Sequence, residues 1–125
     1  SEEWILALID KGNIQAMNFA AKNSIKFNFD NEKKLELLIK VANAGSVEGM
    51  LQLGNFYADS AYYYYISAKY AKRKDKKNYK ILSDTFIRKM INTYELAAEK
   101  GSPGAMYFLG MIYLYGIEQQ YSKYE

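Results

Sequence analysis

Three stretches of the chain align without gaps, and the residues they share constrain the fold more than any other feature of the sequence. They begin at Gly12, Gly45 and Gly101, and each continues with Asn or Ser, a small residue four positions after the glycine and Met at the fifth. A small residue recurs at the ninth position, and the last two copies share Tyr57 and Tyr113 at the twelfth. Agreement at this many positions in three places indicates an internal repeat.

The first residues of each copy predict a junction between two helices. Glycine directly after a helix adopts the left-handed cap conformation at little cost. The next residue, which is Asn13, Ser46 or Ser102, is a good N-cap for a following helix. Pro103 then stands at a first helical position, where its missing N–H is not needed. Each pair therefore ends one helix and begins another within two residues, which predicts antiparallel helical neighbours.

The spacing also predicts which face of each following helix is buried. The fifth, eighth, ninth and twelfth positions after the glycine share one helical face, and we expect the methionines among them to be core residues. A glycine inside a helix costs about 1 kcal/mol relative to alanine, so small residues at the ninth position indicate a close helix approach. Trp4 is expected in the core by its position. The predicted core face comprises Met17, Ala21, Met50, Leu53, Gly54, Tyr57, Met106, Leu109, Gly110 and Tyr113.

The third copy resembles the Sel-one-like repeats, short helix pairs related to tetratricopeptides. The resemblance is carried by Ala97-Ala98, Gly101, Ala105, Leu109-Gly110, Tyr113 and Gly116. It implies an all-α fold, a right-handed α-solenoid (alpha-alpha superhelix) of antiparallel helix pairs. The first copy departs from the pattern, with Ala20-Ala21 in place of Leu-Gly, and the second has Ser60 where the third has Gly116.

We expect a single solenoid domain over residues 1–125, with helix-pair units at about 13–44, 46–100 and 102–125, the last incomplete. Gly12 and Gly45 are 33 residues apart, whereas Gly45 and Gly101 are 56 apart, so the second unit carries about 23 extra residues near 58–82. Both ends read as half-repeats, which predicts a fragment of a longer array. Uncovered apolar faces at such ends predict self-association.

Composition argues against catalysis. The chain has no His and no Cys, which removes the commonest general base, thiol nucleophiles and the usual ligands of zinc. Phosphate-cradling glycine loops and nucleophile signatures such as Ser-x-x-Lys are also absent. We therefore expect no enzymatic activity, no cofactor and no metal site. No stretch approaches the roughly 20 apolar residues of a membrane span.

The helical face opposite the predicted core is the candidate partner-binding surface. In tetratricopeptide-like arrays this face lines a concave groove, and here it mixes amide, charged and aromatic side chains. The alternative is that Phe19, Phe108 and Met111 pack against a neighbouring helix or the inserted segment. The candidate residues are Gln15, Phe19, Lys22, Glu48, Gln52, Asn55, Phe108, Met111 and Tyr115, and the same face carries Lys26, Asp59 and Gly104.

The inserted segment combines tyrosines with basic residues. Seven Lys and Arg residues and one Asp between Tyr62 and Lys80 give a local charge of +6, whereas the whole chain carries +3. The favoured interpretation is an extended helix pair with inward tyrosines, joined by a solvated Lys-rich loop. The alternative is a nucleic-acid surface, because basic and aromatic side chains together bind single strands. Its central residues are Lys72, Arg73, Lys74, Lys76 and Lys77.

These observations favour a non-catalytic scaffold that binds another protein or a peptide. The resemblance implies an adaptor role of this kind, including virulence, accessory or toxin-immunity roles in bacteria. The alternative function is nucleic-acid binding through the inserted segment, which we regard as the less favoured of the two because no recognised nucleic-acid motif accompanies the basic residues.

Overall fold

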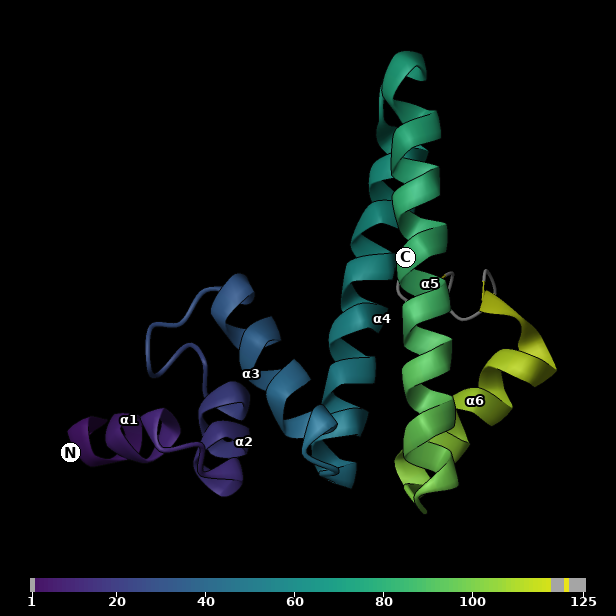
Figure 1. The fold of residues 1–125 in the computed structure, drawn as a ribbon. Helices are drawn as coiled ribbons and strands as arrows, with labels where there is room; N and C mark the ends of the chain where they lie inside the picture. The colour runs from purple at the N-terminus through teal and green to yellow at the C-terminus, as the bar shows by residue number, and fades with distance from the viewer. Residues whose placement is uncertain (1, 118–120, 122–125) are drawn as a thin grey trace.

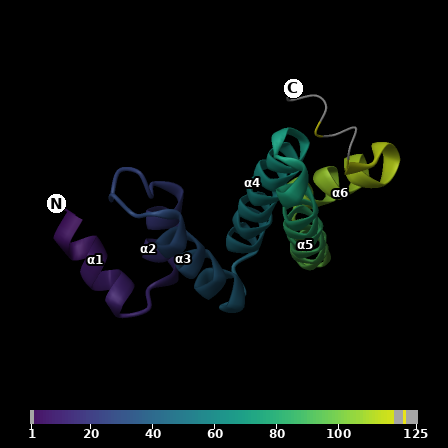
Figure 2. The ribbon, with the colours of Figure 1, turned by 90° about the horizontal axis from the view of Figure 1, so that it is seen from above.

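The computed structural model describes residues 2–117 and 121, and in this part of the chain all regular structure is helical. The six helices follow one another across the molecule in chain order, and each packs on the next (Figures 1 and 2). The all-α class predicted from the repeats is therefore confirmed. The helices are α1 (Glu2–Asp10), α2 (Ile14–Lys22), α3 (Asn31–Asn43), α4 (Val47–Tyr70), α5 (Arg73–Glu99) and α6 (Pro103–Tyr115).

The three glycine junctions have the predicted geometry. Gly12, Gly45 and Gly101 all have φ between 82° and 95°. Each glycine N–H donates to the carbonyl three residues back, and the next N–H donates to the carbonyl five residues back, which together form a Schellman cap. The following side chain then caps the next helix: Asn13 Oδ1 and Ser46 Oγ accept from backbone N–H groups at 2.8 Å and 3.0 Å. The repeated sequence therefore produces a repeated turn.

The centre of the core lies where α3 meets its neighbours. Leu37, Leu38 and Val41 are fully buried, and burial of each such side chain contributes about 1.5–3 kcal/mol. The small residue four positions after Gly45 is needed here, because a Cβ on Gly49 would lie 2.5 Å from Cγ2 of Val41. The fourth-position glycine thus lets α4 start directly against α3.

The longest elements are α4 and α5, which form a hairpin that extends well beyond the other helices (Figure 1). The inserted segment forms the extended helix pair that was predicted for it. The prediction of a Lys-rich loop between the two helices was wrong. Only Ala71 and Lys72 connect the two helices, and α5 begins at Arg73, inside the segment that was expected to be a Lys-rich loop. Lysine and arginine are good helix formers, so the basic residues extend α5 rather than interrupt it.

The predicted core face holds in the first two copies and fails in part in the third. Met17, Met50 and Leu109 are buried, whereas Met106 is 51% exposed and Tyr113 is 66% exposed. A Cβ on Gly110 would meet no atom within 4 Å, so no close approach requires this glycine. Only Gly116, Ile117 and Tyr121 follow α6 among the described residues, and the side of α6 that carries Met106 and Tyr113 is exposed.

Trp4 was also wrongly placed in the core, since its side chain is 61% exposed on α1. It lies beside Phe19 and Phe27 around a surface hollow rather than beneath another helix. The predicted last half-repeat after Gly116 falls mostly on residues 118–120 and 122–125, which lie outside the described residues.

Candidate partner-binding groove

The candidate stripe of α2 faces solvent, as its helical position predicts. Gln15, Phe19 and Lys22 are all exposed, and Phe19 makes an edge contact with the ring of Phe27 at a centroid distance of 6.0 Å. The aromatic ring is thus supported from one side and open on the other. Phe19 is therefore largely unpacked, whereas Phe108 packs on Tyr94 of the neighbouring helix α5, as the alternative interpretation held.

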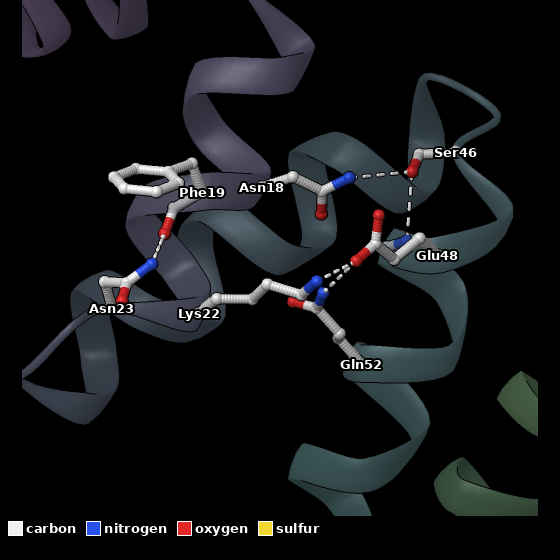
Figure 3. Close-up of polar contacts among 8 residues, drawn as sticks. Asn18, Phe19, Lys22, Asn23, Ser46, Glu48 and Gln52 are labelled. Carbon is white, nitrogen blue, oxygen red and sulfur yellow. Dashed lines mark hydrogen bonds and ion pairs between the residues drawn. The ribbon is translucent and has the colours of Figure 1, made fainter.

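Polar side chains connect α2 to the beginning of α4 (Figure 3). Lys22 forms an ion pair with Glu48, and Gln52 Nε2 donates to Glu48 Oε1 at 3.2 Å. In the more buried part of the contact between α2 and α4, Asn18 Nδ2 donates to Ser46 Oγ at 3.0 Å. This hydrogen bond links α2 to the N-cap of α4. An exposed ion pair of this kind contributes at most about 1 kcal/mol, so Lys22 and Glu48 remain available to a partner.

A hollow of about 240 Å³ lies further along α4, where α4, α5 and α6 meet. Asn55 of α4 accepts a hydrogen bond from the hydroxyl of Tyr94 on α5 at 2.6 Å. The Tyr94 ring stacks on Phe108 of α6 at a centroid distance of 5.4 Å and a tilt of 21°. The hollow is lined by Asn55, Ala58, Asp59, Met90, Tyr94, Phe108, Ile112, Ile117 and Tyr121.

Two ionisable groups of the hollow, Asp59 and Tyr121, differ in their surroundings. Partial burial raises the pKa of Asp59, and the charge of Lys34 partly opposes this effect. Burial also raises the pKa of Tyr121 to about 12, and its hydroxyl has no hydrogen-bond partner among the described residues. The Tyr121 ring contacts Tyr62 and Tyr65 in the second half of α4, so this side chain borders the hollow on that side.

Most of the predicted residues lie in two groups. One group lies where α2 meets the beginning of α4, and the other lies around the hollow of α4, α5 and α6. Glu48, Gln52 and Asn55 share one face of α4, which leads from the α2 contacts to the hollow. Phe108 joins this face through Tyr94. Met111 is half-buried and Tyr115 is exposed, and neither side chain lines the hollow.

Tyr94 is the principal residue of the hollow that the sequence did not mark as functional. Its side chain is only 2% exposed. The signal that distinguishes it from Ile or Leu is the hydroxyl, because a buried tyrosine hydroxyl needs a polar partner. Asn55 provides that partner, and the pair fixes the floor of the hollow.

The five basic residues of the candidate nucleic-acid surface lie together at the end of the hairpin. Lys72 precedes α5, and Arg73, Lys74, Lys76 and Lys77 occupy its first turns. All five side chains are exposed. This surface is separate from the hollow of α4, α5 and α6, which lies nearer the other end of the hairpin.

The described residues contain no helix long and apolar enough to cross a membrane. In the same part of the chain no three acidic side chains come close enough together to hold a metal ion. Comparison with known protein families, with curated proteins and with solved structures finds no match to this chain.

Proposed function

We propose that this chain is a non-catalytic scaffold of the Sel-one-like, tetratricopeptide-related kind, which binds an extended segment of a partner protein. The repeated glycine junctions support a helical-repeat array, since each one ends a helix and leads into the next with the same pair of hydrogen bonds. Arrays of such helix pairs form right-handed α-solenoids, whose concave surfaces hold extended segments. The partner segment would lie along the face of α2, α4 and α6 that carries the candidate residues.

The single observation that carries this proposal is the accessible polar face of α4. Glu48, Gln52 and Asn55 are exposed or half-buried although the residues between them, Met50 and Leu53, belong to the core. This face presents amide and carboxylate groups that can hydrogen-bond to a peptide backbone. It ends at an apolar hollow large enough for one side chain, an arrangement typical of peptide recognition.

Phe108 provides the sharpest test, because its neighbour Leu109 serves as a matched control. Phe108 is 39% exposed beside the hollow, whereas Leu109 is 8% exposed in the core. We expect Leu109→Ala to lower the free energy of unfolding by roughly 2–5 kcal/mol. Gln52→Ala is expected to leave the melting temperature nearly unchanged. Phe108→Ala is expected to lower it much less than Leu109→Ala does, and to weaken peptide binding by about 2 kcal/mol.

The measurement uses peptides of about 16 residues selected from a displayed random library on the unaltered chain. Binding of the selected peptides to the variants is measured by calorimetry, and stability by thermal melting. Peptides that bind Phe108→Ala and Gln52→Ala as tightly as the unaltered chain would show that the binding face lies elsewhere. If Phe108→Ala melts as severely as Leu109→Ala, Phe108 is a core residue and the groove assignment is wrong.

A further inference from the structure

The end of the α4–α5 hairpin projects beyond the other helices (Figure 1) and carries most of the basic residues of the inserted segment. The segment from Tyr62 to Lys80 carries a charge of +6, so the remainder of the chain carries −3. In the described part of the chain, no ion pair joins Lys72, Lys74 or Lys77 to an acidic side chain. A strongly basic patch whose cations are not neutralised within the protein attracts polyanions.

The helices beneath this patch are held by contacts between aromatic rings. Tyr64 of α4 stacks on Tyr79 of α5 at a centroid distance of 6.2 Å and on Phe86 at 5.6 Å. Ser83 Oγ, which is buried, donates to the carbonyl of Ala61 at 3.2 Å across the two helices. The basic side chains are therefore displayed from a fixed backbone and not from the solvated loop that the sequence predicted.

A hollow of about 400 Å³ opens at the end of the hairpin. Two tyrosines and two lysines border it, namely Tyr70, Tyr79, Lys72 and Lys74, together with Ser67, Ala71 and Asp75. Tyr70 is 75% exposed. An exposed tyrosine ring beside lysine ammonium groups offers a stacking surface for a base within reach of cations for the adjoining phosphates.

We infer that the end of the hairpin, from Lys69 to Lys80, binds single-stranded nucleic acid. Lys72, Lys74 and the basic residues of the first α5 turns neutralise phosphates, and Tyr70 stacks on one base. This activity uses a different surface from the proposed peptide groove, so the two proposals stand or fall separately.

The lining of the hollow favours a nucleic acid over an acidic protein segment. An acidic protein segment would require apolar pockets for its side chains, whereas the hollow at the end of the hairpin is bordered mainly by polar and tyrosine side chains. Stacking on an exposed tyrosine is the interaction that every nucleic-acid base can make.

The test is fluorescence anisotropy of a labelled oligouridylate of about 12 nucleotides, titrated with the full chain from about 50 to about 300 mM KCl. The triple variant Lys74→Gln, Lys76→Gln, Lys77→Gln is expected to bind at least about tenfold more weakly. It should also reduce the slope of log affinity against log salt by about 2, since each phosphate contact on a single strand contributes about 0.7. Tyr70→Ala should weaken binding about tenfold and leave the slope unchanged.

The matched control neutralises three exposed lysines elsewhere, Lys11→Gln, Lys26→Gln and Lys100→Gln, which removes the same charge from the chain. Affinity for the oligouridylate should stay within about twofold in this control. Equal loss in both triple variants would overturn the site, as would the absence of binding at about 50 mM KCl. Tighter binding to an oligoglutamate peptide or to phosphatidylserine vesicles than to the oligonucleotide, unaffected by Tyr70→Ala, would overturn the assignment to nucleic acid.

Discussion

Gly54 lies at the point where the ring of Tyr94 crosses α4. A Cβ at this position would stand 2.5 Å from both Cδ1 and Cε1 of that ring, so alanine forces the ring or the helix to move. We expect Gly54→Ala to lower the free energy of unfolding by about 1–3 kcal/mol, as overpacking does. The hydroxyl of Tyr94 would then shift from Asn55, which changes the floor of the hollow between α4, α5 and α6.

Gly110 is the matched control for this substitution, since it occupies the same position in the third copy and a Cβ added to it would have no atom within 4 Å. Gly110→Ala is expected to stabilise the chain by roughly 0.5–1 kcal/mol, because alanine is the better helix former. Urea unfolding of both variants measures the two changes. Stabilisation by Gly54→Ala would contradict the close packing of Tyr94 on α4.

Local residue chemistry was predictable, whereas burial at some positions was not. Asn13, Ser46 and Ser102 cap helices because a cap depends only on residues within one turn. Met106 and Tyr113 repeat the positions of Met50 and Tyr57, yet they are exposed because burial requires a second element against that face. A repeated sequence therefore predicts a repeated turn more safely than a repeated core.

At the scale of the elements, the length of α5 also depends on contacts with a second element, which the local sequence does not reveal. Composition alone allows the Lys-rich segment to be a loop or a helix, since its charges are solvated in both. The tyrosine contacts across the hairpin, such as Tyr64 with Tyr79, form only when α4 continues past Tyr64 and α5 begins before Tyr79. The hollow between α4, α5 and α6 could not be predicted either. Periodicity assigns residues to the faces of each helix separately and does not give the rotation of the three helices relative to one another.

Tyr64 is expected to hold the two halves of the hairpin together. Its ring stacks on Tyr79 and Phe86, and the two contacts lie between the core and the hairpin end. In Tyr64→Ala the backbone amides of residues 62–82 should exchange hydrogen faster, while α2 and α3 keep their protection. Mass-spectrometric hydrogen exchange measures both regions.

Tyr70→Ala is the control for this element, since Tyr70 is highly exposed and lies beyond the stacked rings. It should leave exchange of residues 62–82 unchanged. Equal acceleration in both variants, or faster exchange throughout the molecule in Tyr64→Ala, would show that the ring contacts do not stabilise the hairpin locally.

At the scale of the whole molecule, the two outermost helices of the described chain expose apolar side chains. Pro103–Tyr115 is apolar on nearly every side, and a helix of that kind is normally buried. Met106, Tyr113 and Leu114 are exposed on α6, and Trp4 is exposed on α1. Contiguous apolar surface of this kind marks a site of association.

We therefore expect the chain to self-associate through these faces, with a sedimentation coefficient that rises with protein concentration. The double variant Met106→Lys, Leu114→Lys should shift the chain toward monomer, because charged side chains resist desolvation at the contact. Ile25→Lys is the control: this side chain is also apolar and 93% exposed, but it lies in the α2–α3 connection. Sedimentation velocity of the three proteins at matched concentrations provides the measurement. A chain that stays monomeric throughout the concentration range would contradict the prediction, and so would equal dissociation of the control.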